Sequence, residues 1–84
     1  MSILKEHLEF PNDFTFKIIG DKTPHFEFDV EEIFVGYPER AIQHKISANK
    51  KYVSYSVTVR LLSYEELESL YDRISHLKGL KFYC

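Results

Sequence analysis

The feature that most constrains this chain is a ten-residue run, Tyr52–Leu61, in which apolar and polar residues alternate strictly. The apolar set is Val53, Tyr55, Val57, Val59 and Leu61, and hydroxyl-bearing or basic residues stand between them. Alternation with a period of two is typical of a β-strand that buries one face and leaves the other in water. Because an isolated hairpin is only marginally stable, the rest of the chain must supply more strands and a cover for the apolar face.

A second predicted strand precedes this run and forms a hairpin with it. Residues 41–48 alternate more weakly, with Ile42 and Ile46 on one side, and the polar stretch Asn49-Lys50-Lys51 makes the turn. His44 falls on the same side as the two isoleucines. We therefore expect it to be a core or edge histidine rather than a metal ligand.

Two further strands are predicted near the two ends of the chain. Residues 14–20 alternate, with Phe14, Phe16 and Ile18 on one face, and a turn follows at Gly20. Residues 80–84 alternate again, and we expect Leu80, Phe82 and Cys84 to point toward the core.

Each of two predicted helices begins at a hydroxyl side chain. Thr23 stands before Pro24, a residue favoured at the first helical position, and Ser63 stands three residues before Glu66, which is the spacing of a capping box. Gly36 with Pro38 is expected to end the first helix, and Gly79 the second. The expected buried residues are Phe26, Val30, Ile33, Phe34 and Tyr37 in the first helix, and Leu67, Leu70, Tyr71, Ile74 and Leu77 in the second.

The predicted order of elements is β-α-β-β-α-β. Two right-handed crossovers with this order give a ferredoxin-like α+β sandwich, in which a four-stranded antiparallel sheet carries two helices on one face. We expect the strands at 14–20 and 52–61 to lie at its centre. Residues 1–84 make one such domain, and residues 1–12 are an N-terminal extension in which Leu4 and Leu8 have the spacing of a helical turn.

Composition narrows the classes of partner. A net charge of −2 with 29% charged residues favours neither a nucleic-acid binder nor a membrane-surface protein. The single cysteine, Cys84, leaves no internal disulfide and no cysteine-based zinc site. No stretch is apolar for long enough to be a signal peptide or a membrane span, so we expect a cytoplasmic protein.

The outward face of the predicted sheet is basic and rich in hydroxyl groups. It combines Lys17, Lys45, Arg60 and Lys81 with Tyr52, Ser54 and Ser56, and it also includes Thr15, Ile19, Gln43, Ser47, Thr58 and Tyr83. No acid falls on it, because the acids lie mainly on the predicted helices. Two interpretations stay open: an ordinary solvated sheet whose lysines deter aggregation, and a docking surface for an anionic ligand or an acidic protein patch.

RNA binding is a weaker interpretation of this fold. The RNA-recognition module stacks bases on aromatic residues of its central strands, and Lys51-Tyr52-Val53-Ser54 is similar to the start of its third-strand motif. However, Ser54 stands where a second aromatic belongs, and Thr15 and Lys17 give the first strand none. We therefore expect no nucleic-acid partner.

No catalytic constellation is predicted. The four histidines fall in different elements and lack metal-ligand spacing; they are His7, His25, His44 and His76. A run of acids such as Glu27, Asp29, Glu31 and Glu32 is ordinary for the start of a helix. Three glycines make no phosphate-binding loop. We expect no enzyme activity, no metal and no cofactor.

The chain as a whole resembles the YbeD-like family of small bacterial proteins with an ACT-domain-like fold. The resemblance rests on Glu9-Phe10-Pro11, on Phe14-Thr15-Phe16-Lys17-Ile18-Ile19-Gly20, and on Lys45-Ile46-Ser47 leading to Tyr52-Val53-Ser54-Tyr55-Ser56-Val57-Thr58. It implies a bacterial cytosolic protein without known catalytic residues. Where the family often has a glycine in the hairpin turn, this sequence has Lys50, so we expect Asn49 to take the left-handed backbone conformation.

The resemblance also points to a candidate ligand site. ACT domains bind amino acids where the first strand meets the first helix, often between paired domains. Gly20, Asp21, Thr23 and His25 occupy that junction here, with His25 in place of the glycine that lets backbone approach a ligand. The same segment also fits an ordinary strand-to-helix turn capped by Thr23.

Two hypotheses follow. The first is a non-enzymatic regulatory or interaction module that docks a protein partner through the basic sheet face, or that pairs through an edge strand, as in a homodimer. The second is an ACT-like sensor that binds a small metabolite, such as an amino acid, at residues 20–25.

Overall fold

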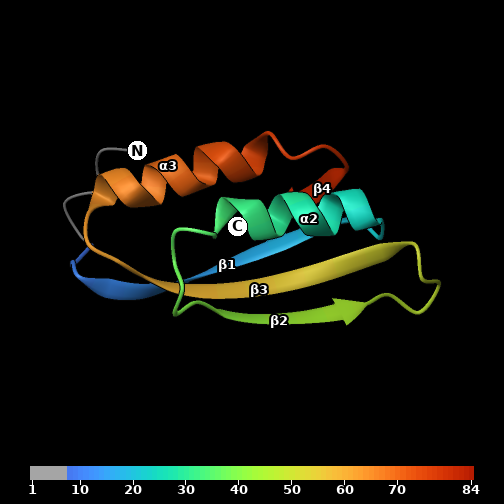
Figure 1. Cartoon of the computed structure of the whole chain (residues 1–84), viewed down its shortest axis with the longest axis horizontal. Helices are drawn as coiled ribbons and strands as arrows, with labels where there is room; N and C mark the ends of the chain where they lie inside the picture. The colour runs from blue at the N-terminus through green and yellow to red at the C-terminus, as the bar shows by residue number, and fades with distance from the viewer. Residues whose placement is uncertain (1–7) are drawn as a thin grey trace.

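The computed structural model describes residues 8–84, which form one four-stranded antiparallel sheet with two helices on one of its faces (Figure 1). In chain order the elements are β1 (Asn12–Asp21), α2 (Pro24–Ile33), β2 (Ala41–Ile46), β3 (Tyr52–Leu61), α3 (Tyr64–Ser75) and β4 (Leu80–Tyr83). The predicted ferredoxin-like fold is confirmed. We call the sheet face away from the helices the open face.

The strands lie in the order β2-β3-β1-β4, so the two predicted central strands are central. β1 and β3 pair over their whole length, from Asn12 opposite Leu61 to Asp21 opposite Tyr52. β1 is longer than the expected segment 14–20, because the residues on both sides of it also pair with β3. Its extra length places an acid at each end, which changes the charge of the open face.

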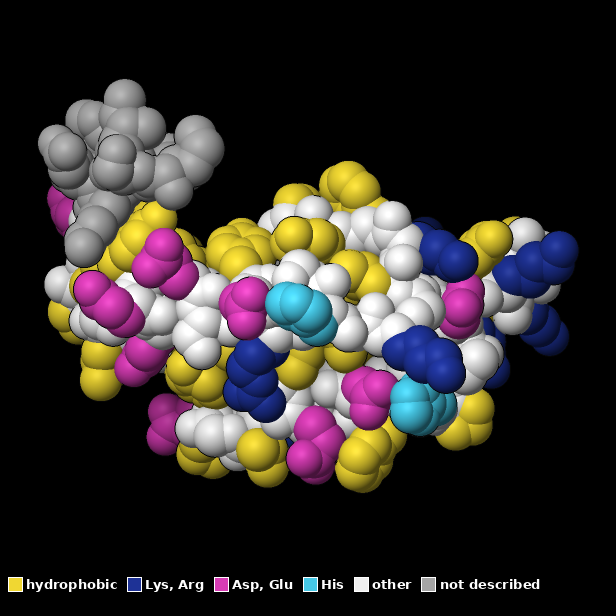
Figure 2. All heavy atoms as spheres, turned by 90° about the horizontal axis from the view of Figure 1, so that it is seen from above, with side chains coloured by type: hydrophobic (Ala, Val, Ile, Leu, Met, Phe, Trp, Pro, Cys, Tyr) yellow, Lys and Arg dark blue, Asp and Glu magenta, His cyan; other side chains and the backbone are white. Residues whose placement is uncertain are grey.

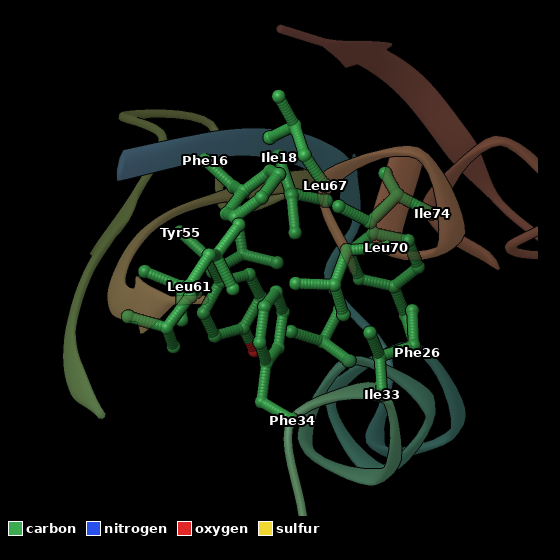
Figure 3. Close-up of a cluster of buried hydrophobic side chains, with 14 residues drawn as sticks. Phe16, Ile18, Phe26, Ile33, Phe34, Tyr55, Leu61, Leu67, Leu70 and Ile74 are labelled. Carbon is green, nitrogen blue, oxygen red and sulfur yellow. The ribbon is translucent and has the colours of Figure 1, made fainter. Parts of the chain in front are cut away.

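The core lies between the sheet and the two helices (Figure 3). Every second residue of β3 from Val53 to Leu61 is buried, as the alternation predicts. The rings of Phe16 and Phe34 lie 5.9 Å apart, and Phe26 packs against Tyr55 at 6.2 Å. Of the residues expected to be buried in the helices, Phe26, Val30, Ile33, Phe34, Leu67, Leu70 and Ile74 are buried, whereas Tyr37, Tyr71 and Leu77 are half-buried.

Both helices begin where the sequence predicts. The Thr23 hydroxyl accepts a hydrogen bond from the Phe26 amide at 3.1 Å, and the Ser63 hydroxyl accepts one from the Glu66 amide at 3.3 Å. The Glu66 carboxylate reaches back to the amide of Leu62 at 3.2 Å. These bonds satisfy backbone donors that have no partner inside a helix.

The predicted helix ends were wrong at both glycines. α2 ends at Ile33 and its C-cap is Phe34, so the helix closes before Gly36, which lacks a left-handed φ. α3 has His76 as its C-cap, whereas Gly79 lies three residues later with φ of 90°. The amide of Leu80 bonds to the carbonyl of Leu77 at 3.3 Å, so Gly79 provides the positive φ of a tight turn before β4.

The hairpin turn has a different backbone from the one expected. Lys50, not Asn49, has the left-handed conformation, with φ of 61°. The Asn49 side chain instead accepts hydrogen bonds from the Ser47 hydroxyl at 2.7 Å and the Lys51 amide at 3.0 Å. Asparagine therefore stabilises the turn through its side chain.

A β-bulge reverses the expected orientation at the end of β4. Ile19 pairs with Phe82 but Gly20 pairs with Leu80, so Lys81 is an extra residue on β4. Phe82 then shares the open face with Ile19, whereas Tyr83 pairs with Ile18 on the helix face. The expectations that Phe82 and Cys84 point inward and Tyr83 outward were wrong, because one inserted residue exchanges the faces of those that follow.

Within the described residues, no helix is long and apolar enough to cross a membrane. The predicted helical turn at Leu4 and Leu8 falls largely outside residues 8–84.

Candidate functional site

The open face brings together all seven residues that the sequence assigns to a docking surface. Lys17 lies opposite Ser56 and Lys45 lies opposite Ser54, while Tyr52 and Arg60 occupy the two ends of β3. Lys81 reaches the same face through the bulge and lines a groove there. These residues come from all four strands, so the sheet alone fixes their relative positions.

The prediction that this face carries no acid was wrong. Asp13 lies opposite Arg60 with 3.4 Å between their charged groups, and Asp21 lies 3.7 Å from the Lys81 ammonium. All four side chains are more than 40% exposed, so each pair contributes little free energy. Lys17, in contrast, has no acidic partner among the described residues, and neither does Lys45.

An apolar strip crosses the same face. Ile19 on β1 pairs with Phe82 on β4, and Phe82 is 54% exposed although it is a large aromatic residue. Tyr52 on β3 is 38% exposed. Sequence analysis placed Ile19 and Tyr52 on this face but assigned Phe82 to the core.

A shallow groove of about 640 Å³ lies at the hairpin end of this face. Ile19 and Tyr52 line it, Lys45 and Lys81 line it from the two edge strands, and Ile46 and Ala48 extend it toward the turn. A surface with an apolar floor and a cation at each side suits an acidic partner that also carries an apolar group.

The residues predicted to bind a ligand at the strand-to-helix junction do not line one cavity. A β-carbon at Gly20 would overlap the ring of Phe26, so the space above this glycine is filled by the core. The Thr23 hydroxyl caps α2. His25 lies on the surface, and its Nε2 is 3.0 Å from the carboxylate oxygen of Asp29. The Asp21 carboxylate turns toward Lys81 on the open face.

A small cavity of about 160 Å³ does open near this junction, between α2 and β2. Thr23 lines it together with Glu27, His44 and Tyr55, and only Thr23 belongs to the predicted ligand site. Burial raises the pKa of the Tyr55 hydroxyl, and Glu27 and Glu31 raise it further. The cavity exists because α2 does not cover β2, which leaves His44 exposed at the sheet edge.

A hollow of about 550 Å³ at the opposite end of the molecule contains two arginines, Arg40 and Arg60. Each of them already lies near an acid, because Arg40 is 3.0 Å from Glu31 and Arg60 is 3.4 Å from Asp13. In the open-face groove Lys81 also lies near an acid, Asp21, but Lys45 has no acidic partner among the described residues.

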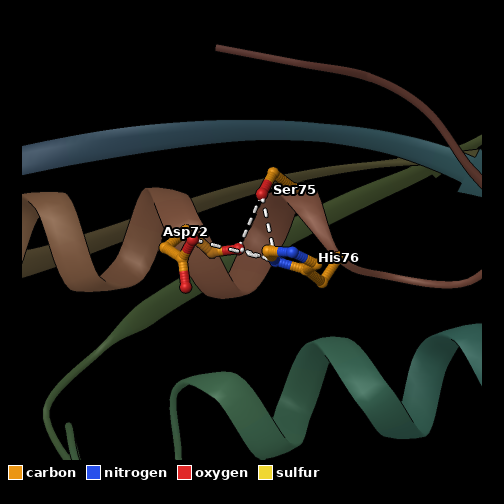
Figure 4. A network of polar contacts seen from close by, with 3 residues as sticks. All are labelled: Asp72, Ser75 and His76. Atoms are coloured by element: carbon orange, nitrogen blue, oxygen red, sulfur yellow. Dashed lines mark hydrogen bonds and ion pairs between the residues drawn. The ribbon is translucent and has the colours of Figure 1, made fainter.

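Asp72, Ser75 and His76 lie close together at the end of α3 without the geometry of a catalytic triad (Figure 4). The Ser75 hydroxyl donates to the carbonyl of Asp72 at 2.7 Å, and the His76 Nδ1 lies 2.7 Å from the same carbonyl. A carbonyl only accepts, so this contact fixes the proton on Nδ1. The cluster satisfies a carbonyl at the helix C-terminus. Residues 8–84 hold no group of three or more His, Cys, Asp or Glu side chains arranged to bind a metal.

Comparison with known proteins gives the relatives of this chain. The model of a family described as protein of unknown function (DUF493) matches residues 5–84. A UPF0250 protein from Shewanella piezotolerans is 33% identical over 78 residues, which cover 90% of this chain and 89% of the relative. A UPF0250 protein from Yersinia pestis is 32% identical over 80 residues, covering 93% and 92%.

Two solved structures share the fold. Protein HP0495 from H. pylori superposes with a TM-score of 0.70 at 19% identity, over 92% of this chain and 85% of that one. The ACT domain from GTP pyrophosphokinase of Chlorobium tepidum superposes with a TM-score of 0.66 at 13% identity, over 87% and 97%. At these identities the two similarities establish the architecture alone.

Proposed function

The chain belongs to the DUF493 family of unknown function, and we propose that it is a non-enzymatic regulatory module that binds a protein partner on its open face. One observation carries this proposal. Apolar side chains and lysines without acidic partners occupy the same uncovered face, with Ile19, Tyr52 and Phe82 beside Lys17 and Lys45.

The combination argues against the face being a merely solvated surface. Protection against aggregation requires lysines only on the edge strands of a sheet, and Lys45 on the edge strand β2 fits that role. Lys17, however, lies on the central strand β1, and the exposed apolar groups extend from β3 to β4. Exposed aromatic residues are typical of the surface where a partner binds, and lysines without acidic partners attract an acidic patch.

Charge reversal on this face tests the proposal. The immobilised chain should retain a protein from a bacterial lysate, and Lys17→Glu should reduce the retained amount about tenfold or more, because it places an acid at the centre of the contact. Lys78→Glu is the matched control, since it makes the same charge change at the same end of the molecule but outside the open face, in the turn after α3. Equal retention by the Lys17→Glu chain and the unchanged chain would remove the open face as the docking site.

A second candidate function is a metabolite sensor at the cavity between α2 and β2. The observation in its favour is that Tyr55, whose hydroxyl pKa is raised by burial, lines this cavity together with Glu27 and His44. An amino acid that binds there should shift the amide NMR signals of Thr23, His44 and Tyr55. A screen of the common amino acids that shifts none of these signals would rule out this class of ligand.

A further inference from the structure

One end of the molecule gathers most of the lysines. The three connections at this end are tied together, because the amide of Lys22 bonds to the carbonyl of Lys51 at 3.0 Å and the amide of Asp21 bonds to the carbonyl of Gly79 at 3.0 Å. The loop after β1, the hairpin turn and the turn before β4 therefore meet in one place. The lysines in and beside these connections are Lys22, Lys45, Lys50, Lys51, Lys78 and Lys81.

This basic end contrasts with the rest of the surface. Asp21 is the one acid within residues 17–22, 44–52 and 78–84, whereas Glu9, Asp13, Glu39, Glu65 and Glu66 lie toward the other end of the sheet. On the helix side of the basic end, Glu27 lies near Lys22 and Asp72 lies near Lys78. Figure 2 shows most of the dark blue side chains at the right-hand end of the view and magenta side chains toward the left. β1 alone separates Asp13 from Asp21 by about 26 Å, about three Debye lengths at physiological salt.

The open-face groove lies at this basic end, and its two cations have a defined spacing, although one of them, Lys81, also lies 3.7 Å from the exposed carboxylate of Asp21. Lys45 is on β2 and Lys81 is on β4, so three interstrand intervals, about 14 Å in total, separate their backbones. Ser54, opposite Lys45, and Ile19, opposite Ser54, lie between them, and Tyr52 lies two residues from Ser54 along β3. Residues i and i+4 of an extended chain are about 13 Å apart, and residues i, i+2 and i+4 point to the same side.

We propose that the groove binds an extended segment of a partner protein with acids at positions i and i+4 and a large apolar residue at i+2. The segment crosses the strands, so its two carboxylates reach Lys45 and Lys81 while the middle side chain covers Ile19 and Tyr52. This inference rests on the proposed function, because it specifies what the partner presents to the open face.

The same geometry favours a short acidic segment over a nucleic acid. A long polyanion that leaves the groove along the sheet meets the acidic end of a chain whose net charge is −2. A short segment contacts only the basic end, because the acids at the far end are screened at this distance.

The test uses the full chain, labelled with ¹⁵N, and the blocked peptide Glu-Ser-Phe-Ser-Glu. We expect saturable amide shifts for Ile19, Lys45, Tyr52 and Lys81. Two matched peptides, Glu-Ser-Ser-Ser-Glu and Lys-Ser-Phe-Ser-Lys, should each bind about tenfold more weakly or worse, since one lacks the apolar group and the other reverses both charges. Moving the second glutamate to i+3 should also weaken binding, because successive residues of an extended chain point to opposite sides.

Variants of the protein complete the test. Lys45→Glu should weaken binding of the acidic peptide about tenfold, and Lys78→Glu, which makes the same charge change outside the open face, should weaken it much less. Absence of amide shifts at a peptide concentration of about 10 mM would mean a dissociation constant above this value, which corresponds to very weak binding. That result would overturn the inference. So would equal binding of the three peptides, or tighter binding of an oligothymidylate of equal charge.

These outcomes separate the inference from the proposed function. If Lys17→Glu abolishes capture of a partner from lysate but the peptide shifts nothing, the open face still docks a partner and the segment chemistry is wrong. If neither experiment succeeds, both are wrong.

Discussion

The ring of Phe26 lies in the space that a β-carbon at Gly20 would fill. Phe26 sits in the first turn of α2 and is fully buried, so the helix can approach β1 at this point only because residue 20 has no side chain. The glycine at the strand-to-helix junction therefore serves the packing of the core. This relationship removes the main reason to place a ligand directly over Gly20.

The contact between Phe26 and Gly20 predicts that Gly20→Ala lowers the free energy of unfolding. An added methyl group in a close-packed core typically destabilises a protein by about 1–3 kcal/mol, and we expect Gly20→Ala to fall in this range. The free energy of unfolding in urea measures the effect. Gly36→Ala is the matched control, because a β-carbon there would meet no atom within 4 Å apart from its chain neighbours and because its φ is not left-handed. Equal stability of the two variants would contradict the packing of Phe26 on Gly20.

The left-handed backbone at Lys50 predicts a stabilising substitution in the hairpin turn. A non-glycine residue in this conformation is strained, so Lys50→Gly should stabilise the fold by about 0.5–1 kcal/mol. Lys51→Gly should destabilise it instead, because Lys51 has an ordinary φ and glycine adds freedom to the unfolded chain. Thermal unfolding of the two variants should therefore move in opposite directions, and the opposite order would place the strain at Lys51.

The bulge in β4 predicts a small cost for Phe82→Ala. Phe82 is 54% exposed on the open face, so its removal should cost about 1 kcal/mol. Phe16→Ala, which empties a fully buried site, should cost about 3–5 kcal/mol. Comparable losses in urea unfolding would mean that Phe82 points into the core and that the strand has no bulge.

The raised pKa of Tyr55 predicts a loss of stability in alkali. Burial and the nearby Glu27 and Glu31 favour the protonated hydroxyl in the folded state, so its pKa lies above the ordinary value of 10.0. The stabilisation is complete below about pH 10 and is lost as the pH rises through the higher folded-state value. Tyr55→Phe should therefore flatten the fall in unfolding free energy above pH 10. An unchanged pH profile would contradict the burial of this hydroxyl.

The sequence predicts the fold well wherever a single rule decides the outcome. In β3 the alternation alone identifies the buried face, and hydroxyl residues before α2 and α3 identify both helix starts. Two features escape such rules. The bulge at Lys81 depends on the hydrogen bonds between β4 and β1, and the acids at Asp13 and Asp21 join the sheet because β3 is long enough to pair with them.

The candidate sites were predicted less completely than the fold. The basic residues of the open face follow from strand parity, so Lys17 and Lys45 could be assigned to it from the sequence. Phe82 could not, because the bulge decides its side. The cavity at Tyr55 arises from the uncovered inner face of β2, and no local pattern shows how far a helix extends over a sheet.

The most direct test of the central claim is an amide NMR spectrum of the labelled chain, titrated separately with the macromolecular and small-molecule fractions of a bacterial lysate. The open-face account predicts shifts or broadening for residues 15–19, 43–45, 52–58 and 81–84 with the macromolecular fraction alone. Shifts confined to the outer surfaces of α2 and α3 would contradict it. Shifts around Thr23, His44 and Tyr55 with the small-molecule fraction alone would also contradict it, and would instead identify a metabolite sensor.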